Sequence, residues 1–132
     1  MSREIKFRGL RVDGKGWVYG SLIQKKGYYA IVIFDKGHDA VYNAYLELQV
    51  IPESVGQFTG IIDKDDVDIY EGDKCLKDGD TTVYIVSWNQ QQGQYWLMPL
   101  NDGVFDFPYQ LSNGYLKLIK IKVIGNINEN KD

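Results

Sequence analysis

Cysteine, histidine and proline are scarce in this sequence, with one, one and three residues respectively among 132. The single thiol of Cys75 excludes a disulfide within the chain and any metal site made of several thiolates. No apolar run approaches the roughly 18 residues that a membrane-spanning helix needs, and the charged opening MSREIKFRGL is unlike a signal peptide. The net charge of −3 gives no overall attraction to nucleic acid or anionic lipid. We therefore expect a cytoplasmic protein that does not contact the membrane.

Aromatic residues and glycine are plentiful instead, with 10 Tyr, 5 Phe, 3 Trp and 14 Gly. This composition favours short strands joined by tight turns, and no segment shows helical periodicity with caps at both ends. The alternating segment EIKFRGLRV, the central-strand candidate TTVYIVSWN and turn sequences such as DGKG and KDGD are examples of a pattern that predicts roughly eight to ten strands. The run from Ala30 to Phe34 is apolar throughout, which predicts a strand covered on both faces. We predict an all-β, mainly β fold with little helix.

The strands are expected to fall into two parts. Pro52 cannot donate to a strand ladder and marks the boundary between them. Residues 1–53 are predicted to form an N-terminal β-layer, which packs on a C-terminal SH3-like β-barrel part formed by residues 54–132. One compact unit is the alternative to this division. In the last strand, YLKLIKIKVIGNI, the apolar residues change face, which predicts a β-bulge near Leu118–Ile119.

The segment VGQFTGIIDKDDVDIYEGDKC carries six acidic residues and two lysines. A calcium-binding EF-hand loop needs oxygen ligands at positions 1, 3 and 5, Gly at position 6 and Glu at position 12. Registers that start at Asp63 or at Asp66 both place a lysine at position 12. Paired carboxylates could serve a hydrolase, but acidic residues this close in sequence are typically solvated. We therefore predict no catalytic residue, no metal and no cofactor here, and hydrolase is the weakest functional class.

Turn chemistry accounts for the same segment. Glycine adopts left-handed backbone conformations freely, and aspartate side chains accept hydrogen bonds from nearby backbone N–H groups. A turn of this kind, followed by KCLK and a hairpin, is typical of the opening of a small SH3-like barrel. The residues interpreted as this structural turn are Gly60, Asp63, Asp66, Glu71, Gly72 and Asp73.

Two further groups of residues could carry a function. His38 and Cys75 could form a Cys–His pair, but we favour an exposed histidine and a cysteine that fills the core. Aromatic side chains could stack on the bases of single-stranded nucleic acid while basic side chains neutralise its phosphates. We favour the alternative, in which the aromatic residues fill a β-core and the lysines protect strand edges. The candidate surface for nucleic acid or a partner comprises Arg8, Arg11, Tyr28, Tyr29, Trp88, Trp96, Lys120 and Lys122.

Three stretches of the chain resemble the YopX family of bacteriophage and prophage proteins. They are REIKFRGL at residues 3–10, VIPESVGQFTGIIDKDDVDIYEGDKC at residues 50–75 and IKVIGNINEN at residues 121–130. In one respect the chain departs from the family, because Asp66 stands where the family turn has glycine. Aspartate tolerates left-handed geometry better than most residues, so the turn is expected to persist. The resemblance implies a mostly β fold with an SH3-like C-terminal part and implies no enzymatic activity.

These observations together predict a phage-encoded, non-catalytic binding or assembly module in the host bacterial cytoplasm. Small β-domains have strand edges that pairing between subunits would cover, so a homo-oligomer is expected. The partner would be a phage or host protein. The alternative function is single-stranded nucleic-acid binding through the Tyr/Trp and Lys/Arg surface.

Overall fold

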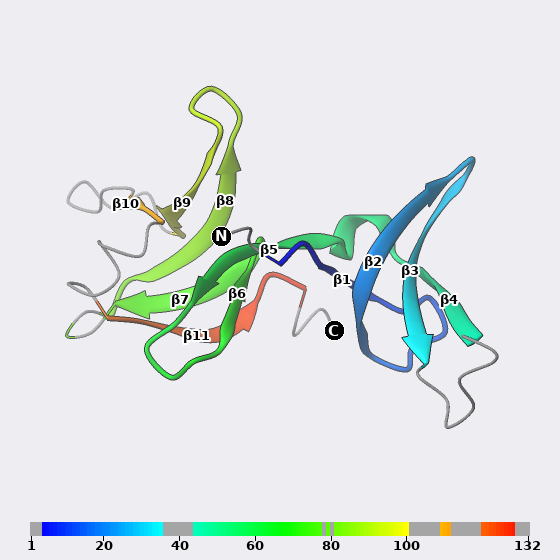
Figure 1. Ribbon diagram of the computed structural model, residues 1–132. Helices are drawn as coiled ribbons and strands as arrows, with labels where there is room; N and C mark the ends of the chain where they lie inside the picture. The colour runs from blue at the N-terminus through cyan, green and yellow to red at the C-terminus, as the bar shows by residue number, and fades with distance from the viewer. Residues whose placement is uncertain are drawn as a thin grey trace. The chain divides into compact units, whose positions relative to one another are not determined.

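The computed structural model describes residues 4–35, 44–77, 79, 81–100, 109–111 and 120–128. Within these residues the chain consists of antiparallel strands and one short 3-10 helix (Figure 1). The strands are β1 (Phe7–Leu10), β2 (Trp17–Lys25), β3 (Tyr28–Asp35), β4 (Ala44–Val50), β5 (Gly56–Ile62), β6 (Asp68–Tyr70), β7 (Asp73–Lys77), β8 (Val83–Asn89), β9 (Gln94–Pro99), β10 (Tyr109–Gln110) and β11 (Ile121–Asn126). The 3-10 helix η1 spans Pro52–Ser54. The chain divides into two compact units, Met1–Gln57 (unit 1) and Phe58–Asp132 (unit 2).

Unit 1 is an antiparallel meander in which β4, β3, β2 and β1 are neighbours in that order. The β2–β3 hairpin turns at Lys26 and Gly27, where the glycine has a φ of +95° that L side chains rarely adopt. The end of β4 returns to the end of β1, since Ile51 N–H donates to the Leu10 carbonyl at 2.8 Å. The first residues of β5 pair with β1 on its other side, through Arg8 and Gly56.

The core of unit 1 lies on one face of this sheet. The residues of this cluster occupy alternate positions on β3, as expected for side chains on one face of a strand, while Ala30 and Val32 of β3 are buried as well. The cluster comprises Val18, Ile31 and Val50, with Phe7, Leu22, Tyr29, Ile33, Leu48 and Val55 packed against it. Two glycines allow close packing within this sheet. A Cβ atom at Gly9 would lie 2.8 Å from the Val50 Cβ, and one at Gly20 would lie 2.4 Å from the Val32 carbonyl oxygen.

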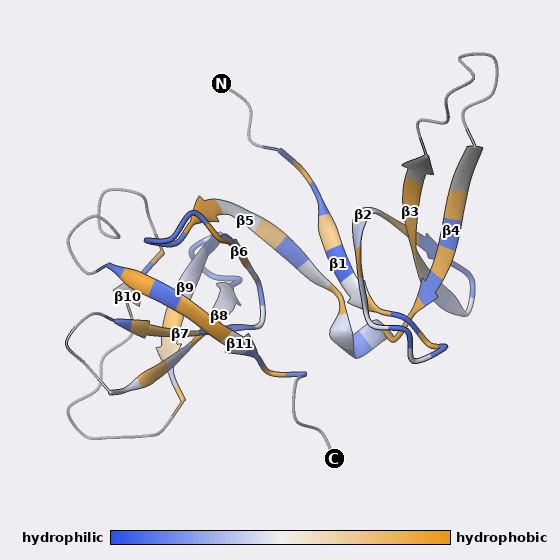
Figure 2. Ribbon diagram, turned by 90° about the horizontal axis from the view of Figure 1, so that it is seen from below, coloured by the Kyte–Doolittle hydropathy of each residue, from blue (hydrophilic) through white to orange (hydrophobic). Residues whose placement is uncertain are grey.

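Unit 2 contains a sheet in which β10, β9, β8, β7 and β11 are neighbours in that order. Its strands β7, β8 and β9 are joined in sequence, and the last strand, β11, pairs with β7. Figure 2 shows hydrophobic and hydrophilic residues following one another along β11. The hairpin of β5 and β6 completes the unit, and its register shifts between Phe58 and Ile62.

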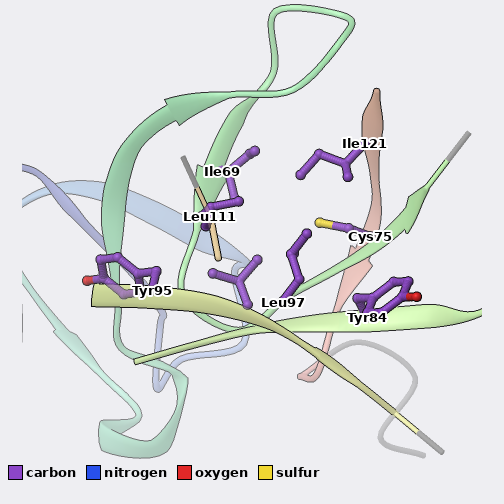
Figure 3. Packing of buried hydrophobic residues seen from close by; sticks show 8 residues of the cluster. Ile69, Cys75, Tyr84, Tyr95, Leu97, Leu111 and Ile121 are labelled. Carbon is purple, nitrogen blue, oxygen red and sulfur yellow. The ribbon is translucent and has the colours of Figure 1, made fainter. Parts of the chain in front are cut away.

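The core of unit 2 gathers side chains from β6, β7, β8, β9 and β11 together with Leu111 (Figure 3). Its buried members are Ile69, Cys75, Tyr84, Val86, Tyr95, Leu97, Leu111 and Ile121. Along β8 and β9 the buried residues alternate with more exposed ones, because successive side chains point to opposite faces of a strand. The sheet therefore has one face on the core and one face directed away from it.

The predicted mainly β fold with little helix is confirmed for the residues that the structure describes. The SH3-like barrel is not confirmed, because neither sheet closes on itself within those residues. The predicted bulge near Leu118–Ile119 and His38 lie outside the described residues. Within β11 the register shifts between Val123 and Gly125. Nowhere in the described ranges is there a helix long and apolar enough to cross a membrane.

Candidate functional site: the acidic segment and the face opposite the core of unit 2

The turn between β5 and β6, residues 63–67, is built around the side chain of Asp63, which is only 6% exposed. Its Oδ1 accepts hydrogen bonds from the backbone N–H groups of Asp65 at 2.8 Å and Val67 at 2.9 Å. The backbone N–H of Asp63 donates in return to the Val67 carbonyl at 2.8 Å. Asp66 adopts a φ of +64° within this turn, a conformation that aspartate tolerates better than most residues. We call residues 63–67 the acidic turn.

The acidic turn also closes the free edge of β11. Asp63 Oδ2 accepts a hydrogen bond from Val123 N–H at 2.9 Å, across 60 positions of sequence, and Lys64 N–H donates to the Ile121 carbonyl at 3.0 Å. An edge strand leaves such N–H and C=O groups without a ladder partner. The carboxylate of Asp63 and the backbone of Lys64 therefore satisfy β11 where a further strand would otherwise pair.

A second buried carboxylate organises the turn between β6 and β7. Asp73 is 1% exposed, and its Oδ2 accepts a hydrogen bond from Tyr70 N–H at 2.7 Å. Gly72 supplies the left-handed backbone with a φ of +92°, and its N–H donates to the Val86 carbonyl at 2.9 Å. Glu71, between them, is half-buried. This turn therefore fixes the start of β7 against β8.

Gly60 lies in the irregular part of β5, where its φ of +85° accommodates the shifted register. The preceding residue, Thr59, is buried and was not singled out by the sequence analysis. Its hydroxyl donates to the Ile69 carbonyl at 2.8 Å and accepts from Ile61 N–H at 3.2 Å. An isolated glycine within a short extended segment is the sequence signal that indicates such a bulge.

The arrangement of the acidic segment suits hydrogen bonding to the backbone. Within the described ranges, no group of three or more His, Cys, Asp or Glu side chains could hold a metal ion. The two buried carboxylates, Asp63 and Asp73, accept hydrogen bonds from backbone N–H groups of the fold, whereas Asp65 and Asp66 are exposed to solvent. Asp63 and Asp73 thus stabilise the backbone conformation of the turns, and Asp65 and Asp66 contribute negative charge to the surface of the acidic turn.

The buried thiol of Cys75 lies near both carboxylates. Burial raises the pKa of this thiol far above its ordinary value of 9.0, and the negative charges of Asp73 and Asp63 raise it further. A thiol reacts as its thiolate, so this environment suppresses nucleophilic chemistry at Cys75. Its place among Ile69, Tyr84 and Ile121 in the core is that of a small apolar residue.

We expect Cys75 to resist a thiol reagent in the native protein and to react fully after denaturation. Between the ordinary thiol pKa of 9.0 and the raised pKa of the folded state, only the unfolded chain loses its proton. The free energy of unfolding should therefore fall as pH rises above 9, by up to about 1.4 kcal/mol per pH unit. Urea denaturation from pH 7 to 10 measures this fall in the free energy of unfolding. The Cys75→Ala variant should lack the part of the fall that comes from ionisation of the thiol. Rapid reaction of the native protein with the reagent would contradict the prediction.

The aromatic and basic candidates are distributed over both units. In unit 1, Arg8 is buried with its guanidinium 4.7 Å from the centre of the Trp17 ring, and Arg11 pairs with Asp13 at 2.6 Å. Tyr28 and Tyr29 are half-buried neighbours on β3 and point to opposite faces.

In unit 2, Trp88 and Trp96 lie on opposite faces of the β8–β9 ribbon. Trp88 pairs with Tyr95 in the ladder, and their rings meet edge to face with centres 4.9 Å apart. Trp96 pairs with Ser87, which is the next pair along the ladder after Trp88 and Tyr95. Side chains of successive pairs in a ladder point to opposite faces of the sheet. Lys120 and Lys122 are exposed at the start of β11. The two tryptophans therefore do not form one stacking platform.

The face of the unit 2 sheet opposite the core is apolar at its centre. The ladder places Leu76 of β7 beside Val83 of β8, and Ile85 of β8 beside Met98 of β9. Leu100 N–H donates to the Val83 carbonyl at 2.8 Å, which extends the first of these rows. Met98 is 41% exposed and Leu100 is 48% exposed. We call these five residues the outer face.

Lysines border the outer face on the side of β11. Lys122 pairs with Leu76 in the ladder, and Lys74 pairs with Ile85. Their side chains share the outer face with these partners, because directly paired residues point to the same side of a sheet. The described residues contribute no acidic side chain to this face. The outer face is therefore apolar with a basic border.

Comparison with known proteins places this chain in a family. A family model with the description YopX protein matches residues 6–132. The chain belongs to the YopX family. No protein with a curated description matches the chain. The match extends through both units of this YopX-family chain, so the acidic turn and the outer face both lie within the family region, and the resemblance seen in the sequence is confirmed.

Proposed function

We propose that this YopX-family chain is a phage- or prophage-encoded binding or assembly module, non-catalytic, that acts in the host bacterial cytoplasm. The observation that carries the proposal is the outer face, where Met98 and Leu100 are exposed and the other apolar side chains are partly exposed, on a sheet that also builds the core of unit 2. Side chains held on a regular sheet need little further ordering when a partner binds. Exposed apolar residues that gather in one place typically mark interaction sites.

The acidic segment supports the same proposal. It is the densest group of ionisable residues in the chain, and its buried carboxylates accept hydrogen bonds from backbone N–H groups at the turns of unit 2. Cys75 has a pKa raised by burial and by these carboxylates. The buried carboxylates and the thiol of this segment thus stabilise the fold of unit 2. Recognition of a partner at the surface is the function that the geometry supports best.

A capture experiment with a matched variant tests the proposal. Tagged protein is incubated with lysate of a phage-infected or lysogenic host, in parallel with the double variant Met98→Ser/Leu100→Ser. Both side chains lie outside the core and are 41% and 48% exposed, so the variant should fold normally. We expect the native chain to retain a defined protein partner and the variant to bind it at least about tenfold more weakly, or about 1.4 kcal/mol. Equal capture by both proteins would contradict a role for the outer face.

The alternative function, single-stranded nucleic-acid binding, can be tested with the same purified protein by tryptophan fluorescence. An oligonucleotide titrated at low salt should quench tryptophan fluorescence in a salt-sensitive manner if the chain binds it. Quenching of this kind, together with no retained protein, would replace the proposed function with this one. The placement of Trp88 and Trp96 on opposite faces of one ribbon favours the protein partner.

A further inference from the structure

The outer face needs a partner surface with exposed apolar side chains and negative charge. Its centre is apolar, and its border carries the positive charges of Lys74 and Lys122. Within the described part of the chain, neither lysine makes an ion pair. Burying these ammonium groups against an uncharged surface would be costly, because a charge removed from water requires a compensating one. Carboxylates flanked by apolar side chains meet both requirements.

Another part of the same chain has this composition. The acidic turn exposes the carboxylates of Asp65 and Asp66 beside the ammonium group of Lys64, so that its exposed side chains carry a net negative charge. The apolar residues that flank them, Ile62 and Val67, are exposed as well. In Figure 3 the turn between β5 and β6 arches away from the core residues. Asp65 and Asp66 make no ion pair with another described residue. The acidic turn is thus a protruding acidic and apolar segment, complementary in charge to the basic border of the outer face.

We propose that the acidic turn of one copy of this chain docks on the outer face of a second copy. Asp65 and Asp66 would pair with Lys74 and Lys122, and Ile62 and Val67 would contact the apolar centre. This contact is heterologous, because it joins two different surfaces. Each copy keeps an unused turn and an unused face, so association continues into a ring or an open filament. The inference rests on the proposed function and gives it a partner, a second copy of this chain.

Charge reversal with mixing provides a specific test. The face variant is Lys74→Glu/Lys122→Glu, and the turn variant is Asp65→Lys/Asp66→Asn, in which asparagine retains tolerance of the left-handed backbone. All four side chains lie outside the core, and circular dichroism with thermal melting verifies that both variants fold. The control is Lys15→Glu/Lys26→Glu, which reverses two exposed charges in turns of unit 1.

Light scattering across a concentration series supplies the readout. We expect the native chain and the control to increase in mean mass with concentration and to lose this increase at high salt. The face variant alone and the turn variant alone should stay at the monomer mass. Their equimolar mixture should regain association, because an acidic face then meets a basic turn and a basic face meets an acidic turn. Recovery in the mixture would not follow from misfolding of either variant.

Two results would overturn the inference. A native chain that remains monomeric at every concentration excludes the contact. Native association that persists in either variant, or that the mixture fails to restore, shows that copies meet through other surfaces. If the native chain is monomeric but Met98→Ser/Leu100→Ser still loses a captured protein, the proposed function stands and only the identity of the partner changes.

Discussion

Replacement of Asp63 by alanine should destabilise unit 2 by about 3 kcal/mol. The substitution leaves three backbone N–H groups, those of Asp65, Val67 and Val123, without their acceptor. A hydrogen bond to a charged group contributes about 1.5–3 kcal/mol when buried, and water can replace part of it at the exposed side of the turn. Hydrogen exchange of β7 and β8 peptides, with urea denaturation, measures the loss.

Asparagine at the same position separates the two roles of the carboxylate. Asp63→Asn keeps one oxygen for the turn and places an amide N–H₂ against Val123 N–H, so we expect about half of the loss seen with alanine. The control is Asp65→Ala, whose side chain is exposed and whose effect should stay within about 0.5 kcal/mol. Equal stability of Asp63→Ala and Asp65→Ala would show that Asp63 does not hold the edge of β11.

Gly20→Ala should destabilise unit 1 by about 3 kcal/mol. The added Cβ would lie 2.4 Å from the Val32 carbonyl oxygen and 3.3 Å from the carbonyl carbon. These are backbone atoms of the neighbouring strand, so they move only if β2 and β3 separate, and overpacking of this kind costs about 1–3 kcal/mol or more. Hydrogen exchange of β2 and β3 peptides localises the effect.

Gly9→Ala provides the comparison, because the nearest atoms there belong to a side chain. Its Cβ would lie 2.8 Å from Val50 Cβ and 2.9 Å from Val50 Cγ1. Val50→Ala removes the two Cγ atoms at 2.9 and 3.0 Å but keeps the Cβ at 2.8 Å, so it should recover only part of the stability that Gly9→Ala loses. Val32→Ala should recover none of the loss in Gly20→Ala, because the carbonyl oxygen remains. Full stability of Gly20→Ala would mean that β2 and β3 lie further apart at this position.

The strands themselves could be predicted from local sequence. TTVYIVSWN, with its β-branched and aromatic residues, predicted a central strand, and Tyr84 and Val86 are indeed buried in β8. The apolar run that starts at Ala30 was expected to be covered on both faces, and Ala30, Ile31 and Val32 are buried. The pattern of apolar residues predicts each strand and its buried side chains from local sequence alone, because successive side chains of a strand point to opposite faces.

The roles of individual acidic residues could not be predicted in this way. Asp63 and Asp65 are chemically identical and two positions apart, yet the first is buried and the second is exposed. The difference comes from Val123, 60 positions further along the chain, whose N–H donates to Asp63. Local periodicity contains no information on such distant partners, and the hydrophobic pattern likewise did not reveal which apolar residues form the outer face.

The burial of Cys75 has a practical consequence for work on this protein. It is the only sulfhydryl in the chain, and it is enclosed in the interior of unit 2. Oxidation therefore cannot link intact copies through a disulfide, and any oligomer must be held without covalent bonds. A cysteine engineered at an exposed position would be the one site open to maleimide coupling, so a fluorophore or spin label can be attached there while the original thiol stays in place.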